Sequence, residues 1–263
     1  MAKHSRTWNH EKYEEYIREG RGQGSGVNYK AWVQIQDFGS QGIVSRAKGL
    51  KTGRIHHLMS NNELAYFYLL EWSDDVIDIR EQYPLLDLNC AVDCAAQAGI
   101  KYPKDNISGF PYVLTCDFMI TTAQGFKART IKMSAELSGG RVLEKLEIER
   151  RYWSMRGIEW KIVTENEISF IKAKNIEWLY SAQDFKIENE SDRINEALKA
   201  MLKMLAAAEY YVMEIIQAIE EKFTLSAGIG LLLYKYLALN KIISFDLGGP
   251  VNLNILKKVS VIK

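Results

Sequence analysis

An aspartate and a lysine on neighbouring strand patterns are the residues of this sequence best suited to chemistry. Asp117 lies in the largely apolar run 113–120, and Lys132 lies in the run 126–133. The Ala-Gln-Gly segment 123–125 supplies a turn, so the pattern predicts a hairpin that brings the two side chains together. A carboxylate can hold a divalent metal, and a neighbouring ammonium can stabilise an oxyanion or position a water. This combination suits hydrolysis of a phosphodiester bond.

Two other acids are candidates for the same site, and each has a structural alternative. Ser60 and Glu63 have the spacing of a capping box at the start of an apolar-faced helix, in which Glu63 binds backbone N–H groups. Glu63 could instead point towards the hairpin as a second metal-binding carboxylate, and the spacing leaves both roles open. Glu149 lies four residues after Lys145 in a predicted helix, 141–156, where an ion pair between them is the alternative role.

The elements around the hairpin predict the fold class. Residues 76–86 have a strand pattern, with Asp78, Arg80 and Gln82 alternating on one face, and residues 160–164 form a short strand pattern. With the helices that begin near 60 and 141, these strands predict an α/β core built on a mixed sheet. Residues 87–112 are expected to be irregular and rich in loops.

Basic residues near the N-terminus are candidates for contacts with nucleic acid. Residues 1–60 carry 10 Lys/Arg against 5 Asp/Glu, whereas the whole chain has a net charge of only +1. Arg21 lies in the glycine-rich segment 20–26, and Lys51 and Arg54 lie in a basic turn, so we expect these three to contact DNA phosphates. The alternatives are a flexible connector and a solvated turn, in which the adjacent histidines 56 and 57 do not chelate a metal.

Composition narrows the class of protein. The chain has 263 residues and 47% hydrophobic content, which is enough to bury a large core. The start of the chain lacks an apolar signal segment, and no apolar run approaches the ~18 residues of a spanning helix, so no membrane partner is expected. Three cysteines without zinc-ligand spacing fit a reducing cytoplasm better than a disulfide framework.

The C-terminal part has a different pattern. Residues 182–192 are polar and predict a linker, and helix patterns follow at about 193–207, 209–222 and 226–239. Two strand patterns, 241–247 and 251–255, then flank a Gly-Gly-Pro turn, so the order predicts a winged helix. The last helix carries only Lys235 as a charged residue, whereas a helix that contacts base edges needs polar side chains. We therefore expect this domain to contact protein.

Several segments together resemble the TnsA family, the endonuclease subunits of heteromeric cut-and-paste transposases. The resemblance spans about residues 17–181 and is carried by five blocks in the same order: 18–24 (REGRGQG), 51–57 (KTGRIHH), 78–82 (DIREQ), 143–153 (LEKLEIERRYW) and 175–181 (NIEWLYS). It implies a restriction-endonuclease-like catalytic domain, placed here at 1–168, and a winged-helix-like interaction domain at 169–263. The Asp117 and Lys132 hairpin is similar to the core of such nucleases.

The resemblance also implies the site, its metal and its partners. The catalytic residues fall on Glu63, Asp117 and Lys132, with Glu149 as an addition, and one or two Mg²⁺ ions, or Mn²⁺, bind Glu63 and Asp117. Such nucleases usually carry an acid or amide two residues before the lysine; here it is Thr130, so the backbone carbonyl of Ile131 is expected to replace it.

The implied partners are transposon-end DNA, a DDE-type transposase, and a regulatory AAA+ ATPase that binds the C-terminal domain. The implied reaction is cleavage of the 5′ strands at the transposon ends. The alternative is a catalytically silent assembly subunit that bridges the transposase and the ATPase, for which Thr130 is the hint. A stand-alone restriction nuclease is disfavoured, because the C-terminal domain lacks a base-reading surface.

Overall fold

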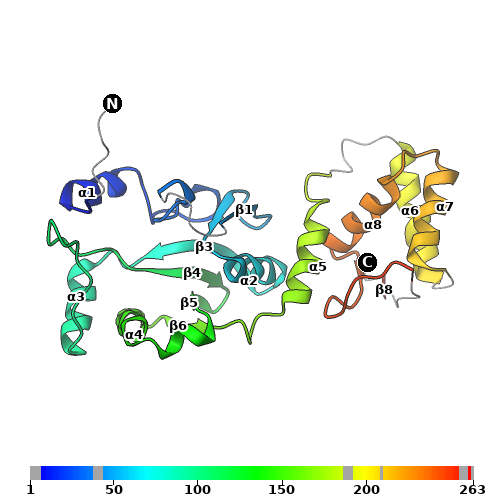
Figure 1. The fold of residues 1–263 in the computed structure, drawn as a ribbon. Helices are drawn as coiled ribbons and strands as arrows, with labels where there is room; N and C mark the ends of the chain where they lie inside the picture. Colours follow the sequence, from blue (N-terminus) through cyan, green and yellow to red (C-terminus); the bar gives the residue numbers. More distant parts are fainter. Residues whose placement is uncertain (1–6, 38–43, 186–191, 208–209, 255–259, 262–263) are drawn as a thin grey trace. The chain divides into compact units, whose positions relative to one another are not determined.

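The chain folds into two compact units, Met1–Ile168 and Ser169–Lys263 (Figure 1). The computed structural model describes residues 7–37, 44–185, 192–207, 210–254 and 260–261. Most of the predicted linker at 182–192 lies outside these residues. None of the described helices is long and apolar enough to cross a membrane.

A four-stranded mixed sheet is the centre of the first unit. Its order is β3 (Val76–Pro84), β4 (Thr115–Thr122), β5 (Gly125–Ile131) and β6 (Glu159–Val163). The first three strands pair antiparallel, and β5 pairs parallel with β6. The prediction of an α/β core with a mixed sheet is confirmed.

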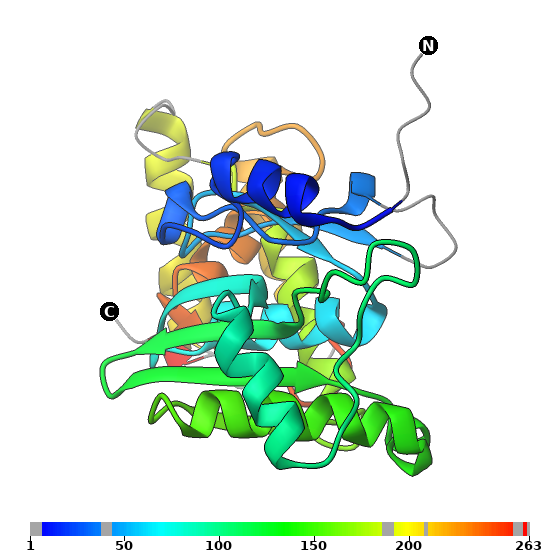
Figure 2. The same ribbon diagram turned by 90° about the vertical axis from the view of Figure 1, so that its left-hand side faces the viewer.

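Helices α3 (Leu88–Gln97) and α4 (Gly140–Ser154) pack on the sheet (Figure 2). Their buried side chains form one core with residues of β4 and β5, including Cys94, Met119, Ala128, Ile148 and Trp153. The prediction that 87–112 is irregular is therefore wrong for α3. Asp87 caps this helix by accepting a hydrogen bond from Cys90 N at 3.1 Å.

A short 3₁₀ turn, η3 (Ser134–Ser138), lies between β5 and α4. The other elements of the first unit precede the sheet in the chain. They are α1 (His10–Arg18), two short 3₁₀ turns, the hairpin of β1 (Ser45–Lys48) with β2 (Ile55–Leu58), and α2 (Asn61–Trp72). Tyr66 of α2 contacts Phe118 of β4, with ring centroids 5.8 Å apart. Helix α2 is thereby fixed against the strand that carries Asp117.

The second unit is mainly helical. It contains α5 (Phe170–Tyr180), α6 (Asp192–Ala207), α7 (Val212–Lys222) and α8 (Ile229–Leu239), which matches the three helices predicted after residue 192 and adds α5. The predicted hairpin is wrong in its pairing. Strand β7 (Ile243–Ser244) pairs with β8 (Ser260–Val261), and 251–254 form no strand. The winged-helix assignment stays a prediction.

The apolar sequence of α8 has a structural cause within this unit. Leu233, Tyr234 and Leu237 of α8 are at most 1% exposed, and the helix packs on α5 and α7. Its apolar character therefore reflects burial in the core of the C-terminal unit.

Candidate active site

The β4–β5 hairpin brings Asp117 and Lys132 together, as the sequence predicts. One carboxylate oxygen of Asp117, Oδ2, accepts a hydrogen bond from Ile131 N at 2.6 Å. Lys132 Nζ lies 4.0 Å from the same oxygen, and its side chain is 32% exposed. Asp117 is 8% exposed, so the hairpin holds a nearly buried acid beside a lysine that reaches solvent.

Glu63 takes part in the cap of α2 and is also linked to the hairpin acid, while its role as a metal ligand stays a prediction. Ser60 caps α2 by accepting a hydrogen bond from Glu63 N at 3.1 Å. The carboxylate of Glu63 turns back to accept from Met59 N at 2.9 Å and from Ser60 Oγ at 3.1 Å. It also accepts from Gln82 Nε2 at 3.2 Å, and the same nitrogen lies 3.4 Å from Asp117 Oδ1. One side-chain amide therefore joins the capping acid to the hairpin acid.

Glu149 reaches the site through another side chain. Its carboxylate accepts hydrogen bonds from Thr130 Oγ1 at 2.6 Å and from Trp160 Nε1 at 3.3 Å. Glu149 is 5% exposed and directed into the protein, so the surface ion pair with Lys145 is not what holds it. Thr130 is 2% exposed and its hydroxyl is engaged with Glu149. Glu149 thus supports the strand that carries Ile131.

Burial dominates the electrostatics of these acids. It raises the pKa of Glu63 to about 8, with the nearby charge of Asp117 adding to the effect. It also raises the pKa of Asp117, although Lys132 opposes the shift. The pKa of Glu149 rises to about 8 for the same reason, while the hydrogen bond from Thr130 opposes the shift. Each carboxylate is therefore costly to ionise in its buried position.

The oxygen atoms present fit a small hard cation. Among the described residues, no three His, Cys, Asp or Glu side chains gather as metal ligands. Glu63 and Asp117, however, lie close enough to share one amide donor, and Mg²⁺ commonly binds one or two carboxylates while keeping several waters. The donor set contains only oxygen, which excludes a zinc-like thiolate or imidazole site.

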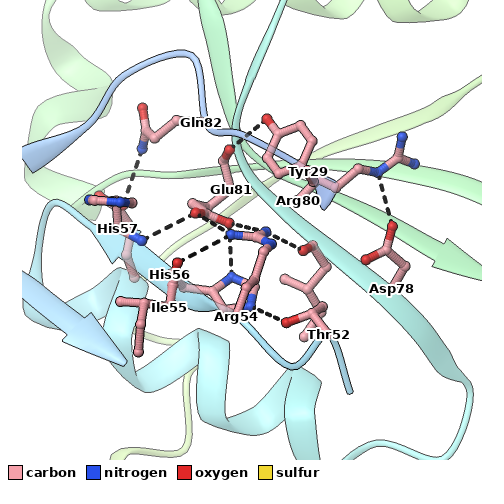
Figure 3. A network of polar contacts seen from close by, with 12 residues as sticks. Tyr29, Thr52, Arg54, Ile55, His56, His57, Asp78, Arg80, Glu81 and Gln82 are labelled. Carbon is pink, nitrogen blue, oxygen red and sulfur yellow. Dashed lines mark hydrogen bonds and ion pairs between the residues drawn. The ribbon is translucent and has the colours of Figure 1, made fainter. Parts of the chain in front are cut away.

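The three basic residues predicted to bind DNA all contact other groups of the chain, and Figure 3 shows Arg54 among its partners. Arg54 donates to the Glu81 carboxylate at 2.7 and 2.5 Å, and its side chain is 9% exposed. Arg21 pairs with Asp37 at 2.6 Å and is 7% exposed. Lys51 donates to the Val76 carbonyl at 2.7 Å. The two guanidinium groups thus have structural partners within the chain, and a DNA-binding role for the three residues stays a prediction.

The expectation of a solvated turn around these residues is wrong at its C-terminal end. His56 is fully buried on β2 and its Nδ1 lies 2.8 Å from the Glu81 carboxylate, while its Nε2 lies 2.7 Å from Thr52 Oγ1. Figure 3 shows Arg54 and His56 gathered at Glu81. This segment is therefore part of the support for β3.

Gln82 and Trp160 are contact residues of the site that the sequence analysis missed. The alternation of Asp78, Arg80 and Gln82 was visible, but which of them faces the acids depends on the register between β3 and β4. Trp160 was missed for the same reason, since its indole reaches Glu149 only through the parallel pairing of β5 with β6.

A mixed sheet with an acid and a lysine on one hairpin, and a second acid from a flanking helix, is consistent with a restriction-endonuclease-like nuclease. Residues 73–165 match the model of the TnsA-like endonuclease N-terminal domain, and residues 167–247 match that of the TnsA endonuclease C-terminal domain. The chain is also 36% identical over 255 residues to the transposon Tn7 transposition protein TnsA of Escherichia coli, which covers 94% of this chain and 90% of that protein. The chain belongs to the TnsA endonuclease family.

Proposed function

We propose that this protein is the Mg²⁺-dependent endonuclease subunit of a heteromeric transposase, which cuts the 5′ strands at transposon ends during cut-and-paste transposition. The observation that carries the proposal is the meeting of Glu63, Asp117 and Lys132 at one end of a mixed sheet, in a chain of the TnsA endonuclease family. The cut is hydrolysis of a phosphodiester bond that leaves a 3′-hydroxyl and a 5′-phosphate.

Glu63 and Asp117, with the backbone carbonyl of Ile131, would hold one or two Mg²⁺ ions, and Mn²⁺ could replace them. When bound, the ion would lower the pKa of the attacking water and neutralise the negative charge that develops on the phosphate. Lys132, 4.0 Å from Asp117 and one-third exposed, orients the water or stabilises the phosphoryl oxygens from the solvent side. The buried acids exclude solvent from the other side.

In this proposal Glu149 is a positioning residue that fixes the end of β5. Its hydrogen bond from Thr130 spans α4 and β5, and Ile131, the next residue, donates its N–H to Asp117. The helix therefore fixes the end of the strand from which both Ile131 and Lys132 extend.

The proposed partner transposase and this protein cut different strands. A DDE-type transposase makes the 3′ cuts and joins them to target DNA, and the protein acts with it on transposon-end DNA in the cytoplasm. The C-terminal unit would bind the regulatory AAA+ ATPase. Since the apolar residues of α8 are largely buried in that unit, the surface that makes this contact includes other residues.

A second candidate is a catalytically silent assembly subunit that bridges transposase and ATPase. The observation that favours it is Thr130, whose hydroxyl is directed to Glu149 where related nucleases carry an acid or amide. This candidate predicts that replacing active-site residues leaves transposition products unchanged.

Insertion products of Lys132→Ala separate the two candidates. Lys132 is partly exposed and makes one long ion pair, so the fold and the partner contacts should survive. The 3′ cuts and joining should then continue without the 5′ cuts, and replication of the joined product should yield cointegrates in place of simple insertions. Lys127→Ala, the same change at the other end of β5, is the control and should keep simple insertions. Simple insertions from both variants would contradict a catalytic Lys132.

A further inference from the structure

The side-chain amide of Gln82 lies between the two acids of the active site. Its Nε2 is 3.2 Å from Glu63 Oε2 and 3.4 Å from Asp117 Oδ1, and its Oε1 accepts a hydrogen bond from Thr115 Oγ1 at 3.3 Å. Gln82 is 5% exposed. A neutral donor therefore occupies the position between two carboxylates where a cation would be most strongly attracted.

The register of the sheet explains how Gln82 comes to this position. Glu81 pairs with Phe118 and Tyr83 with Cys116, so Gln82 stands across from Asp117 on the neighbouring strand. Gln82 has a φ of +48°, a left-handed conformation that is costly for a residue other than glycine. Backbone strain of this kind persists only where the surroundings enforce it and is concentrated at functional sites.

Contacts to Glu81 and to the backbone of Gln82 itself hold this conformation. Tyr29 Oη donates to the Glu81 carbonyl at 2.9 Å, and Trp32 N donates to the Gln82 carbonyl at 3.4 Å. The Glu81 side chain is anchored by Arg54 and His56 (Figure 3). The buried ion network thus holds the strand in the conformation that directs Gln82 between Glu63 and Asp117.

Thr130 leaves the site short of one oxygen ligand. Its hydroxyl donates to Glu149, so the position two residues before the lysine provides no acid or amide to a metal. Gln82, on β3, brings an amide to the carboxylates of Glu63 and Asp117. The Thr115 hydroxyl can both donate and accept a hydrogen bond, so it can pair with either end of this amide.

We propose that Gln82 is a further metal ligand of the active site: its amide nitrogen bridges Glu63 and Asp117 in the metal-free protein, and its amide oxygen binds the divalent cation when the amide reverses. This inference rests on the proposed metal-dependent function. Gln82 would then supply, beside the backbone carbonyl of Ile131, the side-chain ligand that Thr130 does not provide.

Calorimetric titration of the full chain with Ca²⁺, without DNA, tests the proposal independently of activity. Gln82→Met keeps the length and loses the amide, so Ca²⁺ affinity should fall about 10- to 100-fold. Gln82→Glu returns an oxygen ligand and should bind Ca²⁺ at least as tightly as the original chain. Gln124→Met makes the same change in the exposed β4–β5 turn and should leave the affinity unchanged.

The alternative, in which Gln82 only donates hydrogen bonds to the acids, predicts a different order of Ca²⁺ affinities among the variants. Losing the donor would then leave Ca²⁺ affinity unchanged or raised in Gln82→Met, because the ion no longer competes with the amide. Either result, or equal weakening in Gln82→Met and Gln82→Glu, would overturn the proposal.

Asp117→Asn separates failure of this inference from failure of the proposed function. If Asp117→Asn abolishes Ca²⁺ binding and Gln82→Met leaves the affinity unchanged or raised, only the role of Gln82 is wrong. If the unaltered chain binds no Ca²⁺, or Asp117→Asn binds as the unaltered chain does, the metal site itself is wrong.

A crystal structure of the unaltered chain with Ca²⁺ tests the same point should Gln82→Met fail to fold. Gln82 Oε1 at about 2.3–2.6 Å from the ion would support the proposal. The amide nitrogen still directed at the two carboxylates would overturn it.

Discussion

Two sets of buried carboxylates in the N-terminal unit differ in how their charge is balanced: Glu81 alone, and the acids of the candidate active site, Glu63, Asp117 and Glu149. Burial alone would raise the pKa of Glu81, but the charges and hydrogen bonds of His56 and Arg54 outweigh it and lower this pKa to about 2. Glu63 and Asp117 receive hydrogen bonds mainly from neutral groups, with Lys132 4.0 Å from Asp117, and burial raises their pKa values. The first set is complete within the chain; the second is suited to a cation from solution.

Buried acids in the two sets therefore differ in their effect on the stability of the fold. An acid whose counter-charges belong to the chain stabilises the fold. A buried acid without such a partner is a cost to stability and a candidate for metal binding. Neighbouring residues of β3, Glu81 and Gln82, connect the two sets.

The largest expected effect is on stability, from Arg54→Met. This change leaves the fully buried Glu81 carboxylate without its arginine, and removal of one partner from a buried ion pair costs about 3–5 kcal/mol. Urea unfolding followed by tryptophan fluorescence measures the change in the free energy of unfolding. Arg46→Met on the neighbouring strand β1, at an exposed position, should change it by less than about 0.5 kcal/mol. Equal losses of unfolding free energy in Arg54→Met and Arg46→Met would contradict a stabilising role for the ion pair between Arg54 and Glu81.

Glu63→Gln should show the opposite profile, with a large effect on activity and a small one on stability. The pKa of about 8 keeps this acid largely protonated at neutral pH, and glutamine retains an oxygen for the capping contacts. We expect the free energy of unfolding to change by about 1 kcal/mol or less, while nicking falls on the order of 10²–10³-fold. Activity within a few-fold of the unaltered chain would return Glu63 to a capping role.

The dependence of stability on pH should differ between the two sets. The pKa of Glu81 is lowered from 4.5 to about 2, so its stabilisation is present above about 4.5 and is lost as pH falls through 2. Glu63 and Glu149 have pKa values raised from 4.5 to about 8, so their contribution is full below about 4.5 and is lost as pH rises through 8.

Thermal unfolding midpoints test these opposite dependences of stability on pH. They would be measured from pH 2 to pH 9, once in EDTA and once in Mg²⁺. Glu81→Gln should flatten the acidic limb, and Mg²⁺ should reduce the loss on the alkaline limb because it favours the ionised acids. An alkaline limb that Mg²⁺ leaves unchanged would contradict a metal site at Glu63 and Asp117.

The smallest expected effect concerns the basic N-terminal residues. Changing Arg21, Lys51 and Arg54 together would disturb two buried ion pairs, so that variant reports on folding as well as on DNA. Lys51→Ala alone leaves both buried ion pairs in place, so this variant reports on DNA binding separately from folding. If Lys51 contacts a phosphate, the logarithmic salt slope of DNA binding by the assembled complex should fall by about 1. An unchanged slope would count against this contact.

Local patterns in the sequence were enough to predict much of the catalytic unit. The largely apolar run 113–120, the turn at 123–125 and the second run 126–133 predicted the hairpin of Asp117 and Lys132, and the Ser60 to Glu63 spacing predicted the cap of α2. The α3 helix was missed because its first turns pack small residues such as Ala91 and Cys94, which give little of the large apolar periodicity of an amphipathic helix.

Long-range pairing accounts for what could not be predicted. The basic segment around Arg54 has the composition of a phosphate-binding turn, and only the fold shows that Glu81, 27 positions later, neutralises it. Gln82 became part of the site through the register of β3 on β4. In the C-terminal unit, β7 pairs with the distant β8, so the nearer strand pattern was the wrong partner.

Strand cleavage by the assembled transposase is the most direct test of the central claim. Transposon-end DNA labelled on the 5′-cut strand would be incubated with the partner transposase and either the unaltered chain or Asp117→Asn, across a Mg²⁺ titration and in EDTA. The account predicts Mg²⁺-dependent cleavage by the unaltered chain, lost by at least 10²–10³-fold in Asp117→Asn, with the 3′ cuts unaffected. Cleavage of that strand in EDTA, or at equal rates with Asp117→Asn, would contradict it.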